Sequence, residues 1–189
     1  MYKQTSFFLS FFLVGSLAIN FSSPVHAQVL TAQNRDNSEL KQLLDEGHRL
    51  VDTGNYDAAI NVYQQAATIQ PKNASIYSGI GIVYIKQGNL QAALTAFRRA
   101  IQLNPNNADY QYALGYVSSN LGDYVTAKEA YRKAVQTNRR HVDAYMGLAV
   151  ALMGLGEREN AIWAYQEAAK IDPNNPSVGE FRNKVMMQR

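Results

Sequence analysis

The 189-residue chain contains no cysteine. Disulfide bonds, thiolate zinc sites, cysteine nucleophiles and an N-terminal lipidated cysteine are therefore excluded. Its three histidines, His26, His48 and His141, have no partner at the spacing of a metal site or a catalytic triad. Gly79 and Gly81 lie in a helical pattern with no strand before them, so they do not form a phosphate-binding loop. We therefore expect no enzymatic activity, no cofactor and no bound metal.

Charge is also sparse. Only 17% of the residues are charged, and the formal net charge of +3 is too small to indicate a nucleic-acid partner. Basic pairs recur on the predicted second helices and their ends, at Arg98–Arg99, Arg132–Lys133 and Arg139–Arg140. They form either a solvated helix face or a contact for anionic headgroups or an acidic partner. We expect no nucleic-acid binding and no membrane contact, although this stripe leaves membrane contact open.

What the chain has in quantity is a sequence repeat with a period of 34. Each period carries a glycine, an alanine five positions later, an aromatic residue and a closing proline. These columns are Gly54, Gly88, Gly122 and Gly156; Ala59, Ala93, Ala127 and Ala161; Tyr63, Phe97, Tyr131 and Tyr165; and Pro71, Pro105 and Pro173, with Arg139 in the third place. The glycine is expected to end one helix, the next residue (Asn55, Asn89 or Asp123) to cap the following helix, and the aromatic ring to pack in the core.

This pattern resembles the tetratricopeptide repeat, a helix-turn-helix unit. The resemblance implies an all-α superhelix, or solenoid, that binds peptides or proteins. The units are expected at residues 40–73, 74–107, 108–141 and 142–175, followed by a C-terminal capping helix over 176–189. In that last segment Val178, Phe181 and Val185 recur at helical spacing, so we expect this face to cover the fourth unit.

Residues 1–27 have the composition of a secretory signal peptide. Lys3 precedes a mostly apolar stretch from Phe7 to Ile19, and Val25 and Ala27 place small residues before a predicted cleavage at Gln28. Residues 28–38 are polar and are expected to form a flexible leader. The protein is then exported to the periplasm or another extracytoplasmic compartment, or secreted. The alternative is an uncut membrane anchor, although the stretch is shorter than the ~20 residues of a spanning helix.

In tetratricopeptide repeat proteins the first helix of each unit lines the concave groove. The resemblance places twelve residues of this chain there: Leu44, His48, Ser78, Ile82, Ile85, Asp109, Tyr112, Tyr116, Asn120, Met146, Val150 and Met153. The basic and asparagine clamp with which some family members hold a C-terminal carboxylate is missing. The groove is apolar and aromatic instead, which implies an apolar protein segment as the ligand.

Tyr112 and Tyr116 lie four residues apart and so share one helix face. They are either the anchors of the binding surface or rings packed against the neighbouring first helices. We expect an exported scaffold or adaptor with a protein or peptide partner, acting in the assembly or maintenance of an envelope or membrane complex. The alternatives are a membrane-tethered assembly factor and, with less support, an enzyme or small-ligand binder.

Overall fold

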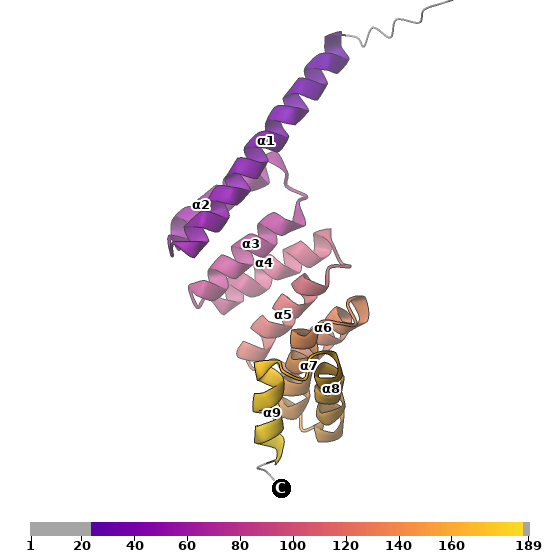
Figure 1. The fold of residues 1–189 in the computed structure, drawn as a ribbon. Coiled ribbons are helices and arrows are strands. Elements are labelled where there is room, and N and C mark those ends of the chain that lie inside the picture. Colours follow the sequence, from indigo (N-terminus) through magenta and orange to yellow (C-terminus); the bar gives the residue numbers. More distant parts are fainter. Residues whose placement is uncertain (1–23, 187–189) are drawn as a thin grey trace, which may run out of the picture. The chain divides into compact units, whose positions relative to one another are not determined.

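The computed structural model describes residues 24–186, and every regular element in that range is a helix (Figure 1). The chain divides into two compact units, Met1–Arg35 and Asp36–Arg189. The described first helices are α1 (Pro24–Asp52), α3 (Ala74–Lys86), α5 (Ala108–Asn120), α7 (Val142–Gly154) and α9 (Pro176–Met186). The second helices are α2 (Tyr56–Ile69), α4 (Leu90–Leu103), α6 (Tyr124–Thr137) and α8 (Arg158–Ile171). The prediction of an all-α fold is confirmed.

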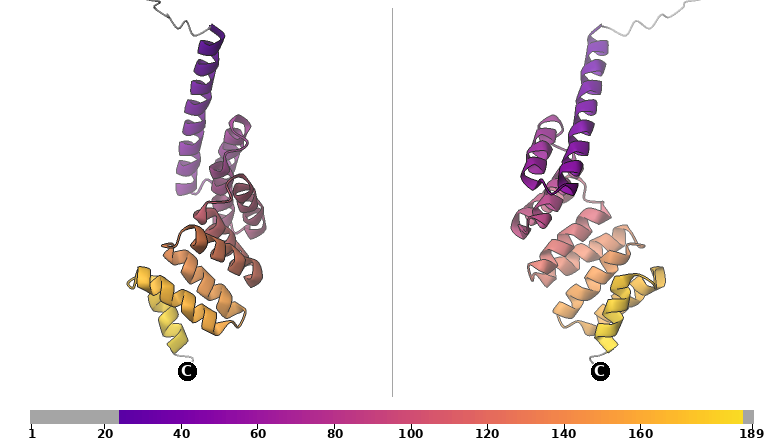
Figure 2. Two further views of the ribbon diagram at one scale, coloured as in Figure 1. Left: turned by 90° about the vertical axis from the view of Figure 1, so that its right-hand side faces the viewer. Right: turned by 60° about the vertical axis from the view of Figure 1, so that its left-hand side comes forward.

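The helices of the larger compact unit, Asp36–Arg189, stack in the order of the sequence (Figure 2). Helices α3, α5, α7 and α9 begin one full period of the sequence repeat apart, and so do α2, α4, α6 and α8. Each helix from α2 to α8 contacts the next, and the first helices α5, α7 and α9 also contact one another in turn. This is a solenoid in which α9 takes the place of a further first helix and covers α7 and α8.

Glycine ends the first helix of each pair, as predicted. Gly54, Gly88, Gly122 and Gly156 all have positive φ values, between 76° and 79°. The residue after each glycine donates its N–H to a carbonyl five positions earlier, as Asn55 does to Leu50 at 2.8 Å. This Schellman arrangement satisfies the last carbonyls of the helix and needs a residue without a Cβ at the left-handed position.

The caps of the helices differ in part from the prediction. The side chains of Asn89 and Asp123 accept from backbone N–H groups in the first turns of α4 and α6, as expected. The expected cap by Asn55 is wrong, because its side chain makes no cap hydrogen bond and its amide donates to Thr53 Oγ1 at 3.0 Å. The first helices have caps that the sequence analysis did not identify, formed by Asn73, Asn107, His141 and Asn175.

The aromatic column forms the core between successive first helices. Tyr63, Phe97 and Tyr131 are 1%, 1% and 3% exposed, which confirms this prediction for three of the four rings. Tyr131 lies between Gly115 of α5 and Gly147 of α7, where any Cβ would overlap the ring. The absence of side chains at these two positions therefore lets a tyrosine fit between adjacent helices. Tyr165 is partly buried, packs against the same core as Tyr131 and stacks on Phe181 of α9, with 5.4 Å between ring centroids.

The N-terminal segment differs from the prediction. The expected flexible leader over 28–38 is helical, since α1 runs without interruption from Pro24 to Asp52. No glycine or proline occurs between Val25 and Glu46, so the helix continues beyond the part anchored by buried Leu40 and Leu50. Residues 1–23 of the expected signal peptide, like the side chain of Val185, lie outside the described residues. Among the described helices, none is long and apolar enough to span a bilayer.

Candidate protein-binding site

A hollow of about 470 Å³ lies among the first helices α5, α7 and α9, with α6 at its base. We call it the tyrosine pocket. Its lining consists of four tyrosines, four other apolar or small residues and five polar ones. These are Tyr112, Tyr116, Tyr124 and Tyr131; Met146, Gly147, Val150 and Phe181; and Ser119, Asn120, Asp143, Ser177 and Glu180.

Tyr112 and Tyr116 take different positions in this pocket. Tyr112 is half-buried, and its ring centroid lies 5.8 Å from that of Tyr131 and 4.9 Å from that of His141. Tyr116, one turn further along α5, is 41% exposed. Tyr112 thus packs against its neighbours, as one of the two interpretations left open by the sequence holds, whereas Tyr116 presents its ring to solvent.

Burial also raises the pKa values of two phenols in the pocket, Tyr112 and Tyr131. It raises the pKa of Tyr112, and the nearby carboxylate of Asp143 raises it further. Burial likewise raises the pKa of Tyr131 well above its ordinary value. Both hydroxyls are therefore neutral at physiological pH, so each remains a hydrogen-bond donor as well as an acceptor.

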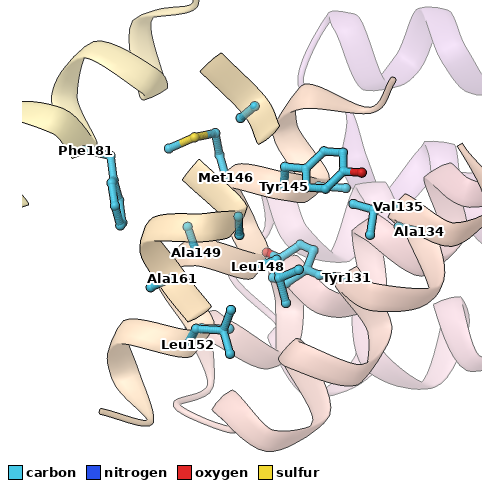
Figure 3. Close-up of a cluster of buried hydrophobic side chains, with 14 of the residues drawn as sticks. Tyr131, Ala134, Val135, Tyr145, Met146, Leu148, Ala149, Leu152, Ala161 and Phe181 are labelled. Atoms are coloured by element: carbon cyan, nitrogen blue, oxygen red, sulfur yellow. The ribbon is translucent and has the colours of Figure 1, made fainter. Parts of the chain in front are cut away.

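The opposite wall comes from α7 and α9. Met146 is buried, whereas Val150, one turn later, is 49% exposed. Between them lies Gly147, where the close approach of the Tyr131 ring leaves no room for a side chain. Figure 3 shows Phe181 of α9 on the Met146 side of the buried cluster, and both residues belong to the same core. Phe181 thus joins the pocket to the hydrophobic core formed by α6, α7, α8 and α9.

Negative charge marks one part of the pocket lining. Asp143 lies in the first turn of α7 and Glu180 lies on α9, and both residues are exposed. Among the side chains that the structure describes, which do not include those of residues 184–186, no lysine, arginine or histidine lines the pocket. The pocket is thus apolar and aromatic, with carboxylates as its only charged groups among the described residues.

The structure brings together five of the twelve residues that the resemblance placed in the groove. They come from α5 and α7, and they are Tyr112, Tyr116, Asn120, Met146 and Val150. Asp109 lies outside the pocket, and its carboxylate is 3.5 Å from Nε2 of His141. Met153 packs against the core formed by α6, α7, α8 and α9 and does not line the pocket.

The other predicted groove residues lie on α1 and α3, away from the pocket. Leu44 packs against the core of the first pair, and the ring of His48 meets that of Tyr63 edge-on at 6.0 Å. Ile85 packs against the small core around Phe97 and Val117. Ser78 is half-buried and Ile82 is exposed, and neither lines the tyrosine pocket. The predicted groove residues that line the tyrosine pocket are therefore confined to α5 and α7.

Several pocket residues were not found by the sequence analysis. Tyr131 was assigned to the core column and proves to line the pocket as well. Ser177, Glu180 and Phe181 were expected only in a cap. The signal that could have found them is the register itself, because Phe181 stands one full period after Gly147 and so falls on the groove side of a further first helix.

Comparison with known proteins identifies the repeat. Two family models match, one described as "TPR repeat" over residues 47–88 and 81–122, and one described as "Tetratricopeptide repeat" over 112–176. The chain is a tetratricopeptide repeat protein. None of the curated proteins compared with it matches.

Solved structures share the fold of this tetratricopeptide repeat protein. A crystal structure of MamA protein is 29% identical, with a TM-score of 0.65, covering 78% of this chain and 79% of that one. YrrB, described as a TPR protein with an unusual peptide-binding site, is 20% identical, with a TM-score of 0.68 and coverages of 84% and 89%. The first TPR of Spaghetti (RPAP3), solved bound to the HSP90 peptide SRMEEVD, is 22% identical, with a TM-score of 0.59 and coverages of 61% and 92%.

Proposed function

We propose that this protein is an exported scaffold or adaptor of four tandem 34-residue repeats, which binds an apolar or aromatic segment of another protein in the tyrosine pocket. We further propose that it acts in the assembly or maintenance of an envelope or membrane complex. The observation that carries the binding proposal is the pocket itself, a hollow of about 470 Å³ lined by four tyrosines and placed on successive first helices.

The physical state of the pocket supports binding. Tyr112 is held in place by the rings of Tyr131 and His141, so little side-chain entropy is lost when a ligand packs against it. Tyr116 and Val150 remain exposed on facing helices, and a ligand would remove their apolar surface from water. A rigid floor with exposed aromatic and apolar walls is typical of a binding hot spot.

Binding is favoured over catalysis. Tetratricopeptide repeat families are typically interaction scaffolds without enzymatic activity, and two of their models match this chain. No group of three or more potential metal ligands occurs among the described residues. The polar residues of the pocket also lack a nucleophile hydrogen-bonded to a base in the part of the chain described.

The export proposal rests on Lys3, the apolar stretch from Phe7 to Ile19 and the small residues before Gln28. Intact-mass measurement of the protein recovered from its host should give a chain that begins at Gln28. A full-length mass in the membrane fraction would instead support the alternative, an assembly factor tethered by its uncut N-terminal segment.

The binding proposal is tested with Tyr116→Ala. The mature chain is first used to capture its partner from host extract, and the affinity for the identified partner is then measured by calorimetry. We expect Tyr116→Ala to weaken binding by about 2 kcal/mol, as at other aromatic hot spots. The melting temperature should stay close to that of the parent, because this ring is exposed.

Trp163→Ala is the matched control, since this side chain is also an exposed aromatic (50%) but lies on α8 outside the pocket. It should leave the affinity unchanged. Adding Tyr112→Ala to Tyr116→Ala should abolish binding and also lower stability, because Tyr112 is half-buried. Normal binding by Tyr116→Ala, or loss of binding by Trp163→Ala instead, would overturn the proposal.

A further inference from the structure

We propose that the tyrosine pocket selects a protein segment that places an apolar side chain in the hollow and a lysine or arginine directly beside it. This inference rests on the proposed function and specifies the chemistry of the partner. It follows from the charges around the pocket, from the exposed tyrosine ring and from the absence, in the described lining, of any group that would hold an acidic segment.

Charge complementarity is the first argument. The carboxylates of Asp143 and Glu180 lie on two different helices and both line the pocket, while no basic side chain does so among those that the structure describes, up to Asn183. A cationic side chain next to the pocket would meet attractive charge from α7 and α9.

The aromatic lining favours the same partner. The face of a tyrosine ring carries partial negative charge, so a lysine or arginine stacked on it is attracted electrostatically. The chain already contains one such contact, in which Cζ of Arg99 lies 5.5 Å from the ring centroid of Tyr77. Tyr116 is 41% exposed and lines the same hollow as the two carboxylates. It can therefore receive a cationic group that also faces them.

The same features disfavour an acidic segment. A peptide ending in carboxylates would bring its charges toward Asp143 and Glu180, with no basic side chain in the described lining to compensate them. Such like-charge placement suppresses wrong partners. A basic apolar segment and an acidic one should therefore be sharply distinguished by this pocket.

The experiment selects peptides from a random dodecapeptide library displayed on phage, using the full chain as bait. The most enriched peptide is then synthesised with a fluorophore, and its dissociation constant is measured by anisotropy at low and high salt. We expect the enriched peptides to carry lysine or arginine within a few positions of a large apolar residue. Replacing that basic residue by norleucine should weaken binding several-fold.

The matched protein variants separate the two claims. Asp143→Asn combined with Glu180→Gln should weaken the peptide about three- to tenfold and flatten its salt dependence, as expected for two exposed charge contacts. Asp109→Asn, which neutralises an exposed acid outside the pocket, should bind like the parent. Tyr116→Ala should bind far more weakly than either variant.

Each outcome bears on one claim. If Tyr116→Ala binds the peptide normally, the proposed function itself fails. If Tyr116→Ala loses the peptide but the doubly neutralised variant keeps its affinity and salt dependence, only the charge inference fails. Enrichment of acidic or uncharged peptides, or of none, also overturns the inference. So does self-association of the chain through this pocket, detected by sedimentation and abolished by Tyr116→Ala.

Discussion

Shortening Phe181 to alanine should destabilise the C-terminal end of the solenoid. This side chain is only 8% exposed, although it belongs to the last helix described. Its ring stacks on Tyr165 with an interplanar angle of 20°, and it shares a core with Met146 and Ala149 (Figure 3). The truncation would remove the stacked ring and leave a cavity between α8 and α9.

The magnitude follows from burial and position. Removing a fully buried phenylalanine ring typically costs about 3 to 5 kcal/mol. Helix α9 lies at the end of the stack, so it can settle inward and recover part of the loss, which gives an expected cost of about 2 to 4 kcal/mol. For a folded unit of roughly 150 residues, each kcal/mol lowers the melting temperature by about 2 to 4 °C. The variant should therefore melt about 4 to 16 °C below the parent.

Thermal unfolding followed by far-ultraviolet circular dichroism measures this shift. Arg182→Ala is the control, because the next residue of the same helix is exposed. It should melt within about 1 °C of the parent. Phe181→Leu should recover part of the loss, since leucine fills some of the cavity. If Phe181→Ala melts like Arg182→Ala, then α9 does not cover the core in solution and the reasoning is refuted.

Two further changes test the packing and the capping. Gly79→Ala should lower the free energy of unfolding by about 1 to 3 kcal/mol, because the new Cβ would lie 2.8 Å from the enclosed ring of Tyr63. Urea unfolding measures this, and a midpoint equal to that of Ser78→Ala would contradict it. His141→Ala should cost about 1 kcal/mol, since Nδ1 of His141 accepts from the N–H of Ala144 at 3.2 Å. His141→Asn should keep a cap, and equal urea midpoints for His141→Ala and His141→Asn would show that a cap at this position does not stabilise α7.

The sequence predicts the backbone of this fold well, because its strongest signals are local. A glycine at a left-handed position, such as Gly54, and a buried ring such as Tyr63 depend on residues nearby in the repeat. Whether a polar side chain caps a helix depends on which neighbouring groups compete for its hydrogen bonds. Asn55 and Asn89 occupy equivalent positions, but Asn55 donates to the hydroxyl of Thr53 and does not cap, whereas the place of Thr53 is taken by Gln87 in the next pair.

The candidate site could be predicted only in part. Helical periodicity assigns Met146 and Met153 to the same side of α7, yet only Met146 lines the pocket while Met153 packs against the core. The hollow itself depends on which neighbours lack a side chain, as at Gly147, and on where α9 places Phe181. These are relations between helices, and a pattern within one helix does not contain them.

The constant interval between helix starts limits how this chain can change in length. Deleting residues 108–141 would join Asn107 directly to Val142, so an asparagine cap would still precede the start of a first helix. If one residue fewer were deleted and the junction lay inside a helix, all following residues of that helix would be rotated about its axis by about 100°. Buried alanines would then move to the surface. Because the helices begin at this constant interval, we expect the fold to accept insertions and deletions inside the stack only when they add or remove whole repeats.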